Sequence, residues 1–167
     1  MRQLTRPIRR AVLVVHVVVS VGWLGVTCGL LTLAIAGAAT DSAEAAEAAY
    51  RAMKVFGDWL VIPLSLLALV SGLVLALGTP WGLARHRWVY AKFWLNLATA
   101  GLSAFALRGH INEVAAQASA GGHVANPADA IIPPAVALAT YVFITAISVL
   151  KPWGLTARGR RHRRVRW

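Results

Sequence analysis

Two polar stripes inside apolar stretches hold the residues of this sequence that are best suited to chemistry. The first lies in Ala11–Ala39, where His16, Ser20, Trp23 and Thr27 follow one another at offsets of 0, 4, 7 and 11. A helix turns about 100° per residue, so these four side chains share one face. Lipid offers an imidazole no hydrogen-bond partner, so this face is predicted to point into protein, with His16 as a candidate functional residue.

The second stripe repeats the spacing of the first, with Lys92, Asn96, Thr99 and Ser103 at the same offsets. Each stripe therefore begins with an ionisable side chain. We predict that the two faces meet in a shared cavity, where Lys92 is a candidate catalytic residue and His16 and Lys92 bind a ligand. Ser20 and Asn96 would then orient the pair.

Each of these residues also has a structural interpretation. Lys92 lies close enough to a helix end to reach the membrane interface with its amine. His16 can be a core histidine that bonds a neighbouring hydroxyl, and small hydroxyl residues are ordinary contacts between membrane helices. The agreement between the two stripes favours the functional interpretation.

The elements that must position these residues are apolar helices. The 167-residue chain is 58% hydrophobic, with a mean hydropathy of +0.63, whereas soluble domains contain about 45–50% apolar residues. Four stretches are long enough to cross a bilayer as helices, namely residues 11–39, 55–77, 88–107 and 131–150. At about 1.5 Å per residue, His16 and Lys92 lie roughly 6–9 Å inside the same membrane face. The sequence thus predicts an all-α, integral membrane four-helix bundle.

The segments between the spans give further expectations. The pattern Asp41-Ser-Ala-Glu44 resembles a helix cap, and Glu47 precedes Arg51 by four residues, so a helix is predicted outside the membrane that continues into the second span. Residues 108–130 are predicted to form a loop, within which Arg108 could pair with Asp58. The Pro133-Pro134 pair is predicted in the first turn of the fourth span.

The distribution of charge predicts the orientation. Lys and Arg number four in residues 1–10, two in residues 81–87 and seven in residues 151–167, against three in the other two connections. All six acids fall on the same side as those two connections. Basic residues favour the cytoplasmic side. We therefore predict a multi-pass protein of the cell membrane with both termini cytoplasmic. The Arg-rich tail 151–167 is predicted to contact anionic lipid head groups rather than nucleic acid.

Metal chemistry is restricted by the residues that the chain contains. Copper(I) prefers sulfur ligands, but the chain has one cysteine, Cys28, and two methionines, Met1 and Met53. A haem with two histidine ligands is excluded, because His16 and His110 lie roughly 20 Å apart in depth. A haem with His16 as one iron ligand stays open, with Lys92 as the second ligand or as a contact to the haem carboxylates.

The pattern His16-x3-Ser20-x2-Trp23-x-Gly25, followed by Trp88-x2-Ala91-Lys92 at the start of the third span, resembles the superfamily of small membrane proteins that contains HemJ and the CopD-type copper-resistance proteins. Many actinobacterial proteins look similar. HemJ proteins are haem-binding protoporphyrinogen oxidases that depend on a membrane histidine and lysine in these motifs. The resemblance implies those roles for His16 and Lys92. The Ala-rich segment 40–54 and the Arg-rich tail depart from the HemJ pattern.

The function predicted from these observations is a haem-associated redox or porphyrin-handling protein. Haem b is the expected cofactor, with His16 on the iron and Lys92, Ser20, Trp23 and Asn96 around the ligand. Two alternatives stay open: a non-enzymatic scaffold or small-molecule-binding subunit, and CopD-like copper handling. Beyond the lipid bilayer, a second copy of the chain or a redox protein is an expected partner.

Overall fold

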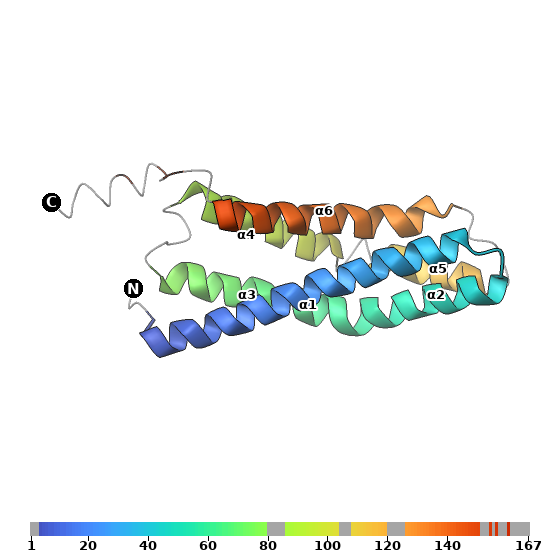
Figure 1. The fold of residues 1–167 in the computed structure, drawn as a ribbon, viewed down its shortest axis with the longest axis horizontal. Helices are drawn as coiled ribbons and strands as arrows, with labels where there is room; N and C mark the ends of the chain where they lie inside the picture. The colour runs from blue at the N-terminus through green and yellow to red at the C-terminus, as the bar shows by residue number, and fades with distance from the viewer. Residues whose placement is uncertain are drawn as a thin grey trace.

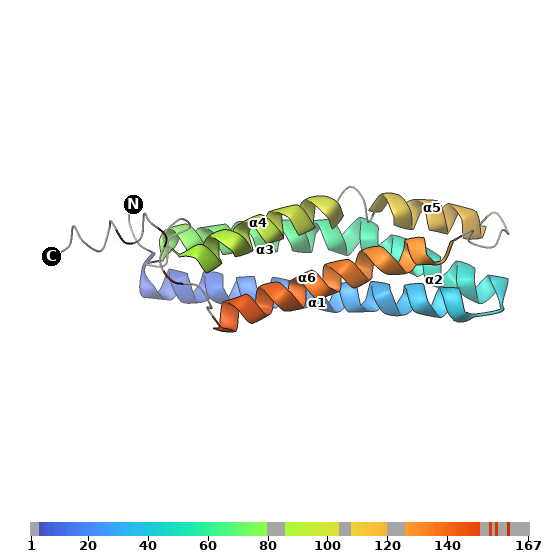
Figure 2. The ribbon, with the colours of Figure 1, turned by 90° about the horizontal axis from the view of Figure 1, so that it is seen from above.

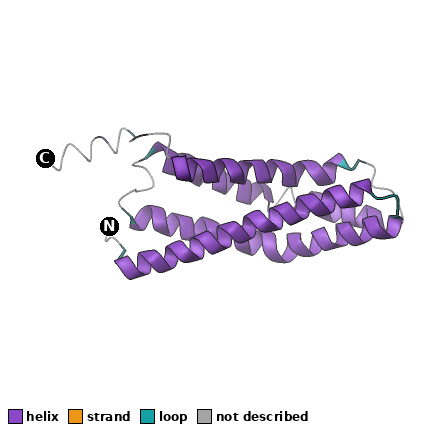
Figure 3. Ribbon diagram, viewed as in Figure 1, coloured by secondary structure: helices purple, strands orange, loops and turns teal. Residues whose placement is uncertain are grey.

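The computed structural model describes residues 4–79, 86–103, 108–119, 126–150, 154, 156 and 160, and every element in these ranges is helical (Figure 3). The helices are α1 (Arg6–Ala39), α2 (Ala43–Phe56), the π-helix η1 (Gly57–Val61), α3 (Ile62–Gly78), α4 (Arg87–Leu102), α5 (Arg108–Ser119) and α6 (Ala128–Leu150). They form one elongated bundle (Figure 1). The predicted all-α class is confirmed.

Three of the described helices are long and apolar enough to cross a membrane: Arg6–Ala39, the continuous helix Ala43–Gly78, and Ala128–Leu150. The predicted third span differs, because α4 has only 16 residues and residues 104–107 lie outside the described part of the chain. Helix α4 packs along α3 and α6, and α5 follows it on the same side of the bundle (Figure 2). The number of membrane passes stays a prediction.

The predicted helix outside the membrane does continue into the second apolar stretch. Ser42 caps its start, accepting a hydrogen bond from the Ala45 amide at 3.3 Å, and Arg51 pairs with Glu47. Helices α2, η1 and α3 then run on without a break. The π-helix directly precedes Pro63, whose ring lacks an N–H and crowds the carbonyl one turn earlier. A wider turn accommodates that ring.

Two expectations about the second half of the chain are wrong. Residues 108–119 form helix α5 instead of a loop, because Ile111, Val114, Ala115 and Ala118 recur at helical spacing and are buried. Helix α6 begins at Ala128, so the proline pair lies inside it rather than in its first turn. Asn126 fixes the earlier start, since its side chain accepts from the Ala128 amide and donates to Asp129.

The buried core consists of two clusters along the bundle. One joins α1, α2, η1, α5 and α6 around Leu30, Tyr50 and Met53. The other joins α1, α3, α4 and α6 around Val19, Trp23, Ala68, Ala100, Ala137 and Tyr141. Large apolar side chains outside these clusters, such as Val14, Val18 and Val70, are exposed. That pattern suits helices whose outer faces meet lipid.

Candidate functional site

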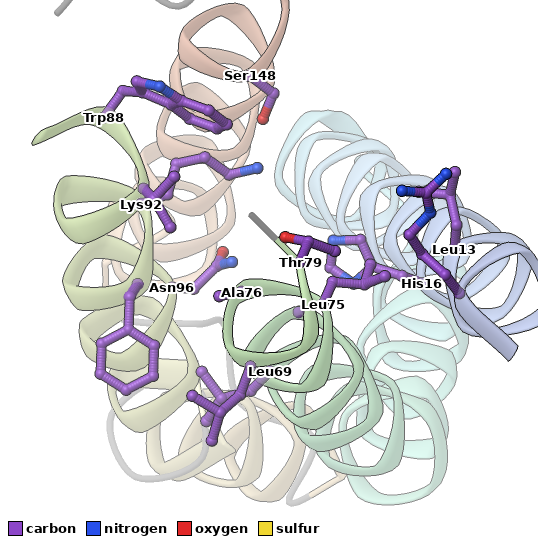
Figure 4. A pocket seen from close by; sticks show the side chains of 15 residues that line it. Leu13, His16, Leu69, Leu75, Ala76, Thr79, Trp88, Lys92, Asn96 and Ser148 are labelled. Atoms are coloured by element: carbon purple, nitrogen blue, oxygen red, sulfur yellow. The ribbon is translucent and has the colours of Figure 1, made fainter. Parts of the chain in front are cut away.

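A cavity of about 510 Å³ lies between helices α1, α3, α4 and α6. Figure 4 shows His16 reaching it from α1 and Lys92 from α4, with Leu75 and Ala76 of α3 between them. Its lining is made of these side chains: Arg9, Leu13, His16, Leu69, Gly72, Leu73, Leu75, Ala76, Thr79, Trp88, Val89, Lys92, Phe93, Asn96 and Ser148. The two leading candidates from the sequence therefore line one cavity. The two polar faces do not meet directly as predicted, because α3 packs against both α1 and α4 and lies between them.

Helix α3 holds the imidazole of His16. The Nδ1 atom lies 2.9 Å from the Oγ of Ser71, and the ring lies against Gly72, where an added Cβ would stand 3.0 Å from Cε1 of His16. Two small residues in succession thus provide a hydrogen bond and the space for an imidazole. The second span takes a larger part in the site than the sequence indicated.

The electrostatic character of the cavity is basic. Arg9, His16 and Lys92 line it, and no described lining residue is an acid. No hydrogen bond or ion pair joins Lys92 Nζ to another described side chain. The six acids of the chain lie at positions 41, 44, 47, 58, 113 and 129, which belong to the opposite end of the bundle. The cavity can therefore receive an anionic group without competition from a carboxylate of the protein itself.

The remaining predicted residues divide between the cavity and the core. Asn96 lines the cavity, whereas Ser20 and Trp23 do not. Trp23 is buried and stacks on Tyr141 of α6, with ring centroids 4.4 Å apart. The stripe on α1 does face protein. A direct role of Ser20 and Trp23 in ligand binding stays a prediction.

A second set of polar side chains lies deeper between the helices. Ser103 Oγ and Tyr141 Oη are 3.4 Å apart, and Thr27 donates to the carbonyl of Trp23 at 2.9 Å. The Nε1 of Trp23 is buried without a hydrogen-bond partner among the described residues. These groups pack the centre of the bundle and are separate from the cavity lining.

Three residues of the site were not predicted from the sequence: Arg9 and Gly72, which line the cavity, and Ser71, which contacts His16. Ser71 and Gly72 interrupt the otherwise apolar run 66–77, and that interruption was the available signal. Ser148 of α6 also lines the cavity, and its hydroxyl donates to the carbonyl of Ile144 in its own helix. Arg9 contributed to the sequence-based prediction only as one of the basic residues that set the membrane orientation.

The end of the bundle formed by α2 and α5 has its own polar contacts. Lys54 Nζ donates to Asp58 at 2.7 Å and to Asn112 of α5 at 2.8 Å. Asp58 therefore has a lysine partner, and the predicted pairing with Arg108 involves a side chain outside the described residues. Cys28 is exposed. Within the described ranges, no three His, Cys, Asp or Glu side chains gather as a metal-binding group.

Comparisons of the chain with protein-family models, with curated proteins and with solved structures gave no match.

Proposed function

We propose that this membrane protein binds an amphipathic, anionic ligand in the cavity, and that the ligand is haem or a related porphyrin. The observation that carries the proposal is the lining itself. One imidazole and two basic side chains border a 510 Å³ space whose other walls are mostly apolar. An apolar body with acidic groups at one edge matches that distribution.

The charge balance supports an anionic ligand. A charged lysine inside a membrane helix costs up to about 3 kcal/mol, less near the interface. No carboxylate of the chain lies between positions 59 and 112 or before position 41, so the protein cannot offset the Lys92 charge at this depth. Carboxylates of a ligand would do so, and Arg9 at the N-terminal end of α1 could bind a second one as a bidentate pair.

The residues present fit a haem with a single histidine ligand. His16 Nδ1 is bonded to Ser71, and no side chain of the described residues forms a hydrogen bond with Nε2. A ring whose other nitrogen is held by a hydrogen bond is the usual form of a histidine ligand. Lys92 and Arg9 would hold the carboxylates, and Trp88 and Phe93 would contact the macrocycle. When bound, the iron supplies one-electron redox chemistry.

The test is an absorption titration of the detergent-purified protein with haemin and with metal-free protoporphyrin. We expect a shifted Soret band with haemin, and about a tenfold or greater loss of haemin affinity in His16→Ala. His110→Ala is the matched control, because His110 lies on α5 beside Glu113 and outside the cavity. Equal losses in both variants, or no porphyrin binding by the wild type, would overturn the proposal.

A non-enzymatic binder of a smaller amphiphile is the second candidate, and one observation favours it. The uncompensated basic charge calls for an anion but not for a metal. A fatty acid would then bind with an affinity that Lys92→Gln lowers and His16→Ala leaves unchanged. Binding of haemin through His16 would decide against this candidate.

We further propose four membrane passes with both termini in the cytoplasm, and a place in the HemJ/CopD-like superfamily. The start of α1 and the end of α6 lie at the same end of the bundle (Figure 1), which an even number of passes would produce. The Arg-rich tail would then lie against anionic head groups of the inner leaflet. A catalytic role for Lys92 belongs to this proposal and requires that a porphyrin is the ligand.

A further inference from the structure

The hydroxyl of Ser71 lies within hydrogen-bond distance of three groups but has a single hydrogen to donate. Its Oγ lies 2.6 Å from the carbonyl oxygen of Leu67 and 3.2 Å from that of Ala68, both in its own helix. It also lies 2.9 Å from Nδ1 of His16. A carbonyl oxygen only accepts, whereas a hydroxyl has one donor and two acceptor sites.

The shortest contact decides where the hydrogen lies. If Ser71 donated to His16, two oxygen atoms with facing lone pairs would stand 2.6 Å apart without a proton between them. If Ser71 donates to Leu67, that distance is an ordinary O–H···O bond, of the kind that serine commonly makes in apolar helices. The hydroxyl then has only a lone pair to offer the imidazole.

We infer that Ser71 is a positioning residue that holds His16 as the Nδ1–H tautomer and leaves the Nε2 lone pair as the ring atom available to a ligand. An accepting Oγ requires a hydrogen on Nδ1. In the neutral ring, Nε2 then carries no hydrogen. That atom can bind an iron or accept a proton from a ligand, but it cannot donate a hydrogen bond.

Gly72 completes this arrangement by leaving room for the ring. An alanine Cβ at this position would lie 3.0 Å from Cε1 of His16 and 3.6 Å from Nδ1. Contacts this short require the ring to move, and movement would lengthen the bond to Ser71. The pair Ser71-Gly72 thus fixes both the tautomer and the position of the imidazole. The use of this arrangement for haem binding rests on the proposed function. The tautomer of His16 does not depend on that function.

The experiment is nitrogen NMR of the ligand-free, histidine-labelled protein in micelles, in alkaline buffer where the imidazoles are neutral. The chain has five histidines, and the spectrum of His16→Gln assigns the relevant signals. We expect the wild type to show a protonated Nδ1 and an unprotonated Nε2. Ser71→Ala should convert this single form into a mixture with Nε2–H, and Ser71→Thr should restore it.

Ser65→Ala is the matched control, because Ser65 is buried on the same helix and bonds only its own backbone, at Ile62. It should leave the His16 signals unchanged. An Nε2–H form in the wild type, or an unchanged single tautomer in Ser71→Ala, would overturn the inference. Because the wild-type spectrum is informative alone, a variant that fails to fold does not remove the test. A protein with the Nδ1–H form that binds no porphyrin would contradict the proposed function and leave this inference standing.

Discussion

At the scale of single residues, Gly37 is a position where α1 leaves no space for a side chain. An added Cβ would stand 2.9 Å from Cζ of Tyr50, whose side chain is only 2% exposed and cannot swing aside. We expect Gly37→Ala to lower the free energy of unfolding by about 1–3 kcal/mol, as overpacking does. Gly25→Ala is the control on the same helix, because nothing lies within 4 Å of its added Cβ. Detergent-denaturation curves in which both variants match the wild type would contradict the packing of α1 against α2.

Replacing Lys92 and replacing Lys54 should have opposite effects on the stability of the protein and on ligand binding. Lys92 has no charge partner among the described residues, so Lys92→Met should keep or raise the stability of the ligand-free protein while lowering the affinity for an anionic porphyrin about tenfold. Lys54 bonds Asp58 and Asn112, so Lys54→Met should lower stability by about 1 kcal/mol and leave binding unchanged. Unfolding curves and porphyrin titrations of both variants check this. A stability loss in Lys92→Met larger than that in Lys54→Met would show that Lys92 has a structural role.

At the scale of elements, the sequence predicted the helices whose formation depends on local features of the chain. The apolar stretches α1 and α6, and the helix from Ser42 through η1 to α3, follow from composition, spacing and capping. Helix α5 was not predicted because its apolar residues are mostly alanines, which give the segment a polar composition. Its burial depends on packing against α2, which the sequence does not show. The contact between His16 and Ser71 was not predicted, for a different reason. Which neighbour faces the stripe of α1 depends on helix packing, and the matching spacing of the two stripes favoured Lys92, whereas the imidazole contacts Ser71 of α3.

Helix α5 provides a prediction at this scale. Twelve residues are too few for a stable isolated helix, so its order depends on packing through Ile111, which is 4% exposed and lies close to Gly57. Ile111→Ala should cost about 2–4 kcal/mol locally and speed amide exchange throughout residues 108–119. The amides of α1 and α3 should keep their protection. Glu113→Ala is the control, because that side chain is 72% exposed. Unchanged exchange in Ile111→Ala would contradict the docking of α5 on α2.

At the scale of the whole molecule, the bundle is longer than a membrane is thick. The 34 residues of α1 span roughly 50 Å, against a hydrocarbon layer of about 30 Å. Helices α2 and α5 are the polar ones, with mean hydropathies well below those of α3 and α6. They lie side by side at the end away from the start of α1 (Figure 1). The cavity lies at the other end, near Arg9.

The orientation of this polar end is the last prediction. Lys and Arg flank the apolar helices at the end that holds Arg9 and Arg87, while the acids gather around α2 and α5. By the positive-inside rule, a reporter fused after Trp167 should give a cytoplasmic signal, and one inserted within residues 118–125 an external signal. Replacing the arginines at 160, 161, 163 and 164 with glutamine provides a control, since the basic N-terminal tail should still hold the orientation. Signals on the same side at both sites would refute an arrangement with α2 and α5 outside and the His16–Lys92 cavity at the inner leaflet.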